Sequence, residues 1–274
     1  MQRDLAPSQT AGVNIFDNVG VVTNKGLEVS LNTRVLDFTA LRYDAQVEAS
    51  WNKNRLESLA PGVSPFGGFG YRNEPGQPLF AAYWPTMTGY SDANKNGVIE
   101  PNEVQVSNGS VFGGSTVPTR TISLNNTIGL LNDRLRLSGL VDYRGGFTTH
   151  EISTGFACGL GPNNCRAIHD PKAPLLDQAR AVAVGRVLGA YWEKGDFIRV
   201  REISASYQLP QSVLRATRSR SANLVFSARN MGIWTKDFTG WDPEILTTGT
   251  DATPYNFVQQ GQPRTYLIRL NLGY

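Results

Sequence analysis

The sequence predicts an all-β fold: antiparallel strands of the kind that cross a membrane within a β-barrel, joined on one side by long extracellular loops. Three observations predict it. Seven segments alternate apolar and polar residues, the segments are long, and the chain ends on an aromatic residue inside the last of them. A strand that crosses a bilayer needs about 9–11 residues, whereas strands of soluble proteins are typically ~5–6 residues long.

The last strand is the plainest of the seven. From Arg264 to Tyr274 the even positions are aromatic or aliphatic except for Arg264 itself. Successive side chains of a strand point to opposite faces, so these residues share one face. Soluble chains usually end in a frayed polar tail. A chain that ends inside an amphipathic strand capped by tyrosine therefore suggests the closing strand of a membrane barrel.

Residues 41–52 alternate in the same way, with an apolar residue at every odd position. This period of two predicts a strand with one apolar and one wet face. The seven predicted strands are residues 26–35, 41–52, 120–131, 134–144, 197–209, 223–234 and 264–274.

The connections between these segments are of two kinds. Tight turns are predicted at residues 35–39 and 131–133, whereas roughly residues 53–118 and 145–194 form long loops. Short turns on one side and long loops on the other are typical of bacterial outer-membrane barrels, and compact soluble domains rarely carry structureless loops beyond ~15 residues. An Ala/Leu/Arg-rich stretch at 175–192 predicts a short helix in the second loop.

Composition excludes two classes of protein. Hydrophobic residues make up 40% of the 274, and no apolar run approaches the ~18 residues of a spanning helix, so a helical membrane protein is excluded. The net charge of +3 comes from interspersed charges rather than from a basic block, so no nucleic-acid partner is expected. The first residues do not form a signal peptide. The chain is therefore cytoplasmic or the C-terminal piece of a longer precursor, and the strands favour the piece.

Cys158 and Cys165 lie in a Gly/Pro/Asn-rich loop with six residues between them. An oxidising compartment would close such a loop with a disulfide, which is the favoured interpretation. Two free thiols are the main alternative. Metal binding is disfavoured because His169 is the only further ligand nearby.

Residues 92–103 fit the twelve-residue pattern of a calcium loop, D-x-N-x-N-G-x-I-x-x-x-E. Calcium binds six to eight oxygens. The predicted ligands are Asp92, Asn94, Asn96, the carbonyl of Val98, Glu100 through water, and Glu103 as a bidentate ligand. A polar Asn/Gly turn is the alternative. Pro101 and the lack of flanking amphipathic helices argue against a complete EF-hand, so the pattern predicts a helix-free calcium loop of modest affinity that braces an extracellular segment.

No enzyme is expected. His150 and His169 both lie in the second long loop, and no nucleophile elbow, phosphate-binding glycine loop or HExxH motif occurs. Asp242 and Glu244 could serve as a catalytic carboxylate pair, but Pro243 between them favours a rigid loop corner.

Several strings along the chain, in order, resemble the C-terminal barrel half of SusC/RagA-type TonB-dependent outer-membrane transporters. They are NKGLEV at 24–29, FGG at 112–114 followed by PT at 118–119, GDFIRVREISASYQLP at 195–210, ARNMGIWTK at 228–236, GWDPE at 240–244 and LNLGY at 270–274. Each string alone is weak, but together they span nearly the whole chain.

The resemblance implies a barrel of about 22 strands in the outer membrane of a Gram-negative bacterium, with an N-terminal plug. It implies import of glycans or peptides, a SusD-like surface lipoprotein as partner, energy from the TonB complex, and calcium-type loops outside the cell. Residues 1–274 then supply about seven or eight strands without the plug, as a fragment whose outer surface meets lipid.

Two functions follow from these observations. The first is a segment of a transport barrel, with a wet lumen lined by Arg42, Asp44, Gln46 and Glu48, or by the opposite face if the register is inverted. The second is a soluble calcium-binding all-β glycan-binding module, in which the apolar faces pack a dry core. The sequence predicts no substrate-binding residues.

Overall fold

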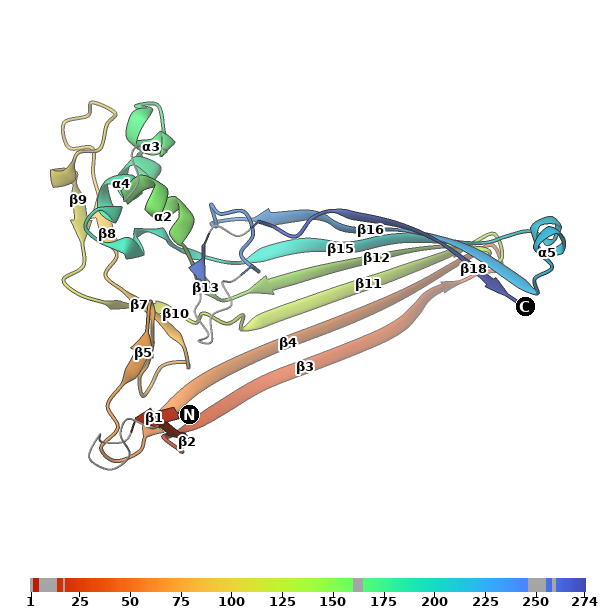
Figure 1. The fold of residues 1–274 in the computed structure, drawn as a ribbon, viewed down its shortest axis with the longest axis horizontal. Coiled ribbons are helices and arrows are strands. Elements are labelled where there is room, and N and C mark those ends of the chain that lie inside the picture. The colour runs from red at the N-terminus through yellow and green to blue at the C-terminus, as the bar shows by residue number, and fades with distance from the viewer. Residues whose placement is uncertain (1, 5–13, 17, 160–164, 246–254, 258–259) are drawn as a thin grey trace.

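The computed structural model is a long sheet with a cluster of loops at one end (Figure 1). It describes residues 2–4, 14–16, 18–159, 165–245, 255–257 and 260–274. Within these residues, no helix is long and apolar enough to cross a membrane.

The long sheet has seven strands, and every neighbouring pair is antiparallel. In spatial order they are β18 (Thr265–Gly273), β16 (Ser221–Thr235), β15 (Phe197–Gln208), β12 (Leu135–Gly145), β11 (Arg120–Leu130), β4 (Leu41–Leu59) and β3 (Gly20–Asp37). These are the seven predicted strands, and the all-β antiparallel class is confirmed. β3 and β4 run further than predicted, because their pairing continues to Gly20 opposite Leu59.

The two ends of the sheet differ. Residues 38–40 and 131–134 are tight turns, and residues 209–220 carry only the short helix α5 (Gln211–Thr217). The described parts of the other three connections, residues 60–119, 146–196 and 236–264, lie at the opposite end, where Figure 1 shows most of the helices and the small strands gathered. The predicted asymmetry between short turns and long loops is therefore present.

The loops are more structured than predicted. They contain a four-stranded sheet, a hairpin, a three-stranded sheet and several short helices. Their elements are β5 (Phe66–Gly68), β6 (Tyr71–Asn73), β7 (Ala81–Trp84), β10 (Val111–Gly114), β8 (Met87–Tyr90), β9 (Val104–Val106), β13 (Thr148–Glu151), β14 (Trp192–Lys194), β17 (Tyr255–Asn256), α2 (Ile152–Gly159), α3 (Arg166–His169), α4 (Leu175–Val184), η1 (Pro101–Glu103) and η2 (Leu188–Tyr191); β1 (Gln2–Asp4) and β2 (Asn14–Phe16) pair near the N-terminus.

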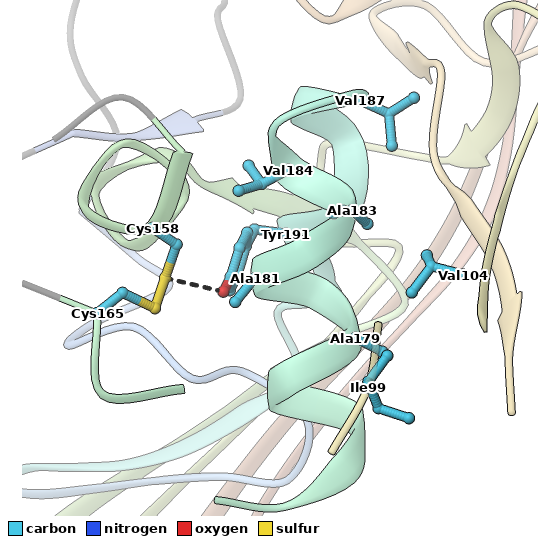
Figure 2. Packing of buried hydrophobic residues seen from close by; sticks show 11 residues of the cluster. Ile99, Val104, Cys158, Cys165, Ala179, Ala181, Ala183, Val184, Val187 and Tyr191 are labelled. Atoms are coloured by element: carbon cyan, nitrogen blue, oxygen red, sulfur yellow. Dashed lines mark hydrogen bonds between the residues drawn. A yellow bond between two sulfur atoms is a disulfide. The ribbon is translucent and has the colours of Figure 1, made fainter. Parts of the chain in front are cut away.

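The buried apolar core lies among the loops, not on the sheet. Figure 2 shows the helix α4 at its centre, with Ala179, Ala183 and Val184 facing the neighbouring segments. The small alanine side chains let those segments approach the helix closely. The predicted short helix is thus the element around which the loops pack, and its burial stabilises their arrangement.

One face of the long sheet is apolar and uncovered. The pairing places Leu31, Val47, Leu124, Val141 and Val200 in one row across five strands. Leu31 is 54% exposed, and Ile268 on β18 is 73% exposed. Soluble monomers rarely expose a continuous apolar surface of this extent, because its transfer into water is unfavourable. The row has the chemistry of a surface that faces lipid.

Candidate functional site

The opposite face of the sheet is polar and internally paired. Ser30, Glu48, Ser123, Asp142 and Arg199 occupy one row across it. The Ser123 hydroxyl donates to Asp142 at 2.8 Å. Cross-strand pairs of this kind satisfy polar groups on a surface that faces water or a wet lumen.

The predicted lumen residues alternate along β4 with the apolar positions; they are Arg42, Asp44, Gln46 and Glu48. Arg34 binds Asp44 at 2.9 Å, Arg42 binds Asp133 at 2.8 Å, and the Gln46 amide donates to Glu48 at 2.8 Å. The strand therefore has one wet and one apolar face, as its alternation predicts.

An ion cluster forms where the chain after β16 folds back onto the polar face. The Arg199 side chain on β15 binds Asp242 at 2.5 Å, and both side chains are only 3% exposed. Arg201 holds Glu244 through two hydrogen bonds of 2.6 and 2.7 Å and holds Asp142 through a third of 2.7 Å. We call these residues, with Arg144 at 3.2 Å from Glu244, the arginine clasp.

The clasp occupies both carboxylates that could have formed a catalytic pair. Burial works to raise the pKa of Glu244, but the hydrogen bonds and charge of Arg201 outweigh it, so the pKa lies below its ordinary value. The stability that this pair contributes is present above the ordinary pKa and is lost as the pH falls through the lowered one. The structure assigns Asp242 and Glu244 to a structural corner, which agrees with the interpretation of Pro243.

The disulfide lies beside the core of the loop cluster. Cys158 lies in the last turn of α2 and is joined to Cys165, which directly precedes α3. The Tyr191 hydroxyl donates to Cys158 Sγ at 3.2 Å, as Figure 2 shows. The disulfide thus links two short helices that have little core of their own, and it forms part of the wall of a cavity.

That cavity has a volume of about 630 Å³ and is open to solvent. Segments far apart in the sequence supply its walls: β13 and α2, α3, α4, the chain after β16, and the region of β17. Its lining residues include Glu151, Thr154, Arg166, Asp177, Thr239, Trp241 and Asn256. Small-molecule sites in proteins are concave and combine apolar walls with a few placed polar groups.

Two buried polar residues lie behind this cavity. Burial lowers the pKa of His150 to about 4, although its Nε2 is 2.9 Å from the Leu188 carbonyl; the ring is therefore neutral at physiological pH. Burial raises the pKa of Glu193, which binds Arg180 at 2.7 Å and accepts from the Thr239 backbone at 2.7 Å. Glu193 therefore holds β14 to the loop that carries Trp241, and His150 holds β13 to η2.

The calcium-type loop is the connection between the paired strands β8 and β9. Its turn has the expected form: Gly97 has a φ of +79°, and Asp92 accepts from the Asn96 and Gly97 backbone at 3.1 and 3.0 Å. No amphipathic helix flanks it, and Pro101 begins η1. Ile99 is buried, with its backbone N–H donating to Gln178 on α4 at 3.0 Å, so the loop is fixed to the loop core.

The predicted ligands hold partners from within the loop. Glu103 accepts from the Ala93 backbone at 2.7 Å and from the Glu100 backbone at 3.1 Å. Glu100 accepts from the amides of Asn94 and Asn96, each at 2.9 Å, and Val98 is exposed. In the described part of the chain, no three acidic, histidine or cysteine side chains converge as a metal-binding group. The spacing and turn fit calcium, and the carboxylates would exchange these partners for the ion.

An antiparallel sheet with an apolar outer face, an ion-paired wet face and loops gathered at one end has the architecture of a membrane β-barrel wall. Comparison with known proteins makes the class more specific. The chain is 25% identical over 269 residues to TonB-dependent receptor P3 of Formosa agariphila and 24% identical over 324 residues to TonB-dependent receptor P26 of the same organism. The matches cover 84% and 98% of this chain but 26% and 31% of the relatives.

Solved structures give the same fold. The RagAB peptide transporter superposes with a TM-score of 0.72 at 18% identity, covering 97% of this chain and 31% of that one. The RagAB peptide importer in its open-open state gives 0.74 at 18% identity, covering 100% and 31%. No known family model matches the chain. The predicted resemblance to TonB-dependent transporters is confirmed.

Two functional features were not predicted from the sequence. The cavity depends on contacts between segments as distant as His150 and Tyr255, which pair between β13 and β17. The clasp depends on Arg199 and Asp242 meeting across a loop. The only sequence signal for either feature was the GWDPE string at 240–244. Its tryptophan lines the cavity, and its two carboxylates belong to the arginine clasp.

Proposed function

We propose that this chain forms part of the wall of a TonB-dependent transporter in the outer membrane of a Gram-negative bacterium, where it takes part in the uptake of nutrients such as glycans or peptides. The observation that carries the proposal is the continuous apolar row from Leu31 to Val200 on one face, with ion-paired polar groups on the other. The relatives are receptors and transporters rather than enzymes, in keeping with a non-enzymatic function.

Open edges support an incomplete wall. Among the residues that the structure describes, β3 pairs only with β4 and β18 pairs only with β16. An unpaired strand edge buried in lipid leaves N–H and C=O groups without partners, at a cost of several kcal/mol each. We infer that both edges pair with further strands, and that residues 1–274 are the C-terminal part of a larger barrel. A SusD-like surface lipoprotein and the TonB complex are the proposed partners of the whole transporter.

Fractionation tests this proposal. In cells that make the protein carrying this chain, we expect it in the outer-membrane fraction, released only by detergent and migrating differently in SDS gels before and after boiling. Recovery in a soluble periplasmic fraction without detergent would overturn the barrel and favour the soluble calcium-binding glycan module.

We propose calcium as the ligand of the 92–103 loop, held by Asp92, Asn94, Asn96, the Val98 carbonyl, Glu100 and Glu103. Extracellular calcium modules bind at about 0.1–1 mM. We expect the intact protein to bind calcium in this range and Glu103→Gln, which replaces a bidentate carboxylate, to lose binding. Glu202→Gln, on the sheet, is the control and should bind normally. A protein that shows no binding at millimolar calcium would exclude the site.

A further inference from the structure

The connection between β15 and β16 carries three arginines close together. Arg215 lies in α5, Arg218 is the C-cap of that helix, and Arg220 directly precedes β16. All three residues are exposed. Among the residues that the structure describes, none of the three forms an ion pair, whereas most arginines of the sheet do. We call these three residues the basic turn.

The acids of the two tight turns at the same end of the sheet do not neutralise this charge. Asp37 is bound by Arg34 at 3.3 Å and by Arg42 at 3.1 Å. Asp133 is bound by Arg42 at 2.8 Å and by Arg136 at 2.6 Å. The basic turn therefore keeps its positive charge. Because neighbouring like charges repel one another, a bound anion would relieve an unfavourable interaction.

The basic turn lies where the apolar face ends. The Arg220 backbone N–H donates to the Gly273 carbonyl at 2.7 Å, and Figure 1 shows α5 beyond the strands, at the end of the sheet that carries the C-terminus. Tyr274, directly after β18, is 76% exposed, and Leu270 on the apolar face is 53% exposed. Tyrosine is enriched at the level of the lipid headgroups. The order toward this end is therefore apolar side chains, an exposed tyrosine and then unpaired positive charge.

The spacing between the apolar face and the arginines fits the headgroup layer of a bilayer. Arg220 is two residues from Ala222, which is opposite Leu272 on the apolar face. At about 3.3 Å per residue, two residues span about 7 Å. The polar layer on each side of a bilayer is about 5–8 Å thick. An arginine side chain, with a long apolar stem and its charge at the tip, reaches this layer from a position at its edge.

We propose that the basic turn binds the phosphate groups of anionic lipids in the periplasmic leaflet of the outer membrane. The proposal rests on the proposed barrel wall, to which it adds a specific lipid contact, and short turns of bacterial barrels face the periplasm. Guanidinium groups fit phosphate because they bind its oxygens through paired, charge-assisted hydrogen bonds. The dipole of α5 favours Arg215 and Arg218 near its C-terminal end, but the effect does not extend past the last turn to Arg220.

The test measures which lipid lies beside the basic turn. The protein that carries this chain is labelled with a fluorophore at Leu270→Cys and reconstituted in vesicles of phosphatidylcholine and anionic phosphatidylglycerol, with one of the two lipids brominated at a time. The acyl chains of a lipid whose headgroup contacts the basic turn pass beside Leu270. One charge near an anionic surface changes binding about fivefold, so we expect brominated phosphatidylglycerol to be preferred at the label by about fivefold or more. Added salt should reduce this preference.

Substitutions separate the basic turn from other sources of charge. Replacing its three arginines with glutamine should lower the preference at least about fivefold, whereas replacing them with lysine should retain most of it. Arg269→Gln is the matched control, because Arg269 is exposed and adjacent to Leu270 in the chain but lies on the wet face, opposite Val225. This control should leave the preference unchanged. A label at Ile198→Cys, on the apolar face near the loops, should report no effect of the basic turn.

The possible failures are distinguishable. Equal quenching at Leu270→Cys by the two brominated lipids, or a preference that persists in the glutamine variant, would overturn the lipid contact and leave the barrel wall intact. A label at Leu270→Cys that neither brominated lipid quenches would overturn both proposals. The three arginines are exposed and form no ion pair among the described residues, so their replacement should leave the fold intact.

Discussion

Asp242→Ala should be among the most destabilising substitutions in this chain. It removes the carboxylate at Nη2 of Arg199, whose side chain is 3% exposed, and leaves only Glu244, 3.2 Å from Nε, to balance the buried charge. Breaking a buried ion pair by removing one partner typically costs about 3–5 kcal/mol, because the remaining charge is buried without compensation. Because Glu244 stays beside the guanidinium, we expect a loss at the lower end of this range, about 3 kcal/mol, in the free energy of unfolding, together with faster trypsin cleavage at the neighbouring Lys236.

The control for this prediction is another aspartate bound by arginine. Asp37 binds Arg34 at 3.3 Å and Arg42 at 3.1 Å, but its side chain is 53% exposed. Exposed pairs contribute about 0–1 kcal/mol, so Asp37→Ala should have little effect. Equal destabilisation by the two substitutions, with no change in cleavage at Lys236, would show that the arginine clasp does not hold the loop to the sheet.

The strands could be predicted because their signal is local. A period of two within residues 41–52 requires no knowledge of the neighbouring strand, and β4 begins at the predicted residue, Leu41. The extension of β4 to Leu59 was missed because residues 53–59 lose the strict alternation, and they are strand only because β3 pairs with them.

The loops could not be predicted in the same way, because long-range contacts determine their structure. Gln178 on α4 binds the backbone of Gly97 and Ile99, about 80 residues earlier. Glu151, Asp177 and Trp241 meet at one cavity from two connections of the chain, residues 146–196 and 236–264. No spacing or periodicity relates them, so a single sequence gives no indication that they form one site. The calcium pattern could be found because its ligands are consecutive in the chain.

A charge on the apolar face should be as costly as the loss of the clasp. Leu124 lies near the middle of β11, between Val47 and Val141. Arginine at the middle of a lipid-facing strand surface costs about 2–4 kcal/mol. We expect Leu124→Arg to lower the free energy of unfolding by this amount, measured from the folded fraction of the protein in vesicles. Asn125→Arg, one residue along and on the wet face, should cost less than about 1 kcal/mol.

A dry protein core would also reject an arginine, so the contact with lipid has to be measured directly. The described chain has no free cysteine, and a fluorophore can therefore be attached to Leu124→Cys or to Asn125→Cys in the protein that carries this chain, reconstituted in vesicles. If the sheet is a barrel wall, brominated lipid quenches the label at 124 and aqueous iodide quenches the label at 125. A label at 124 that brominated lipid leaves unquenched would contradict the account.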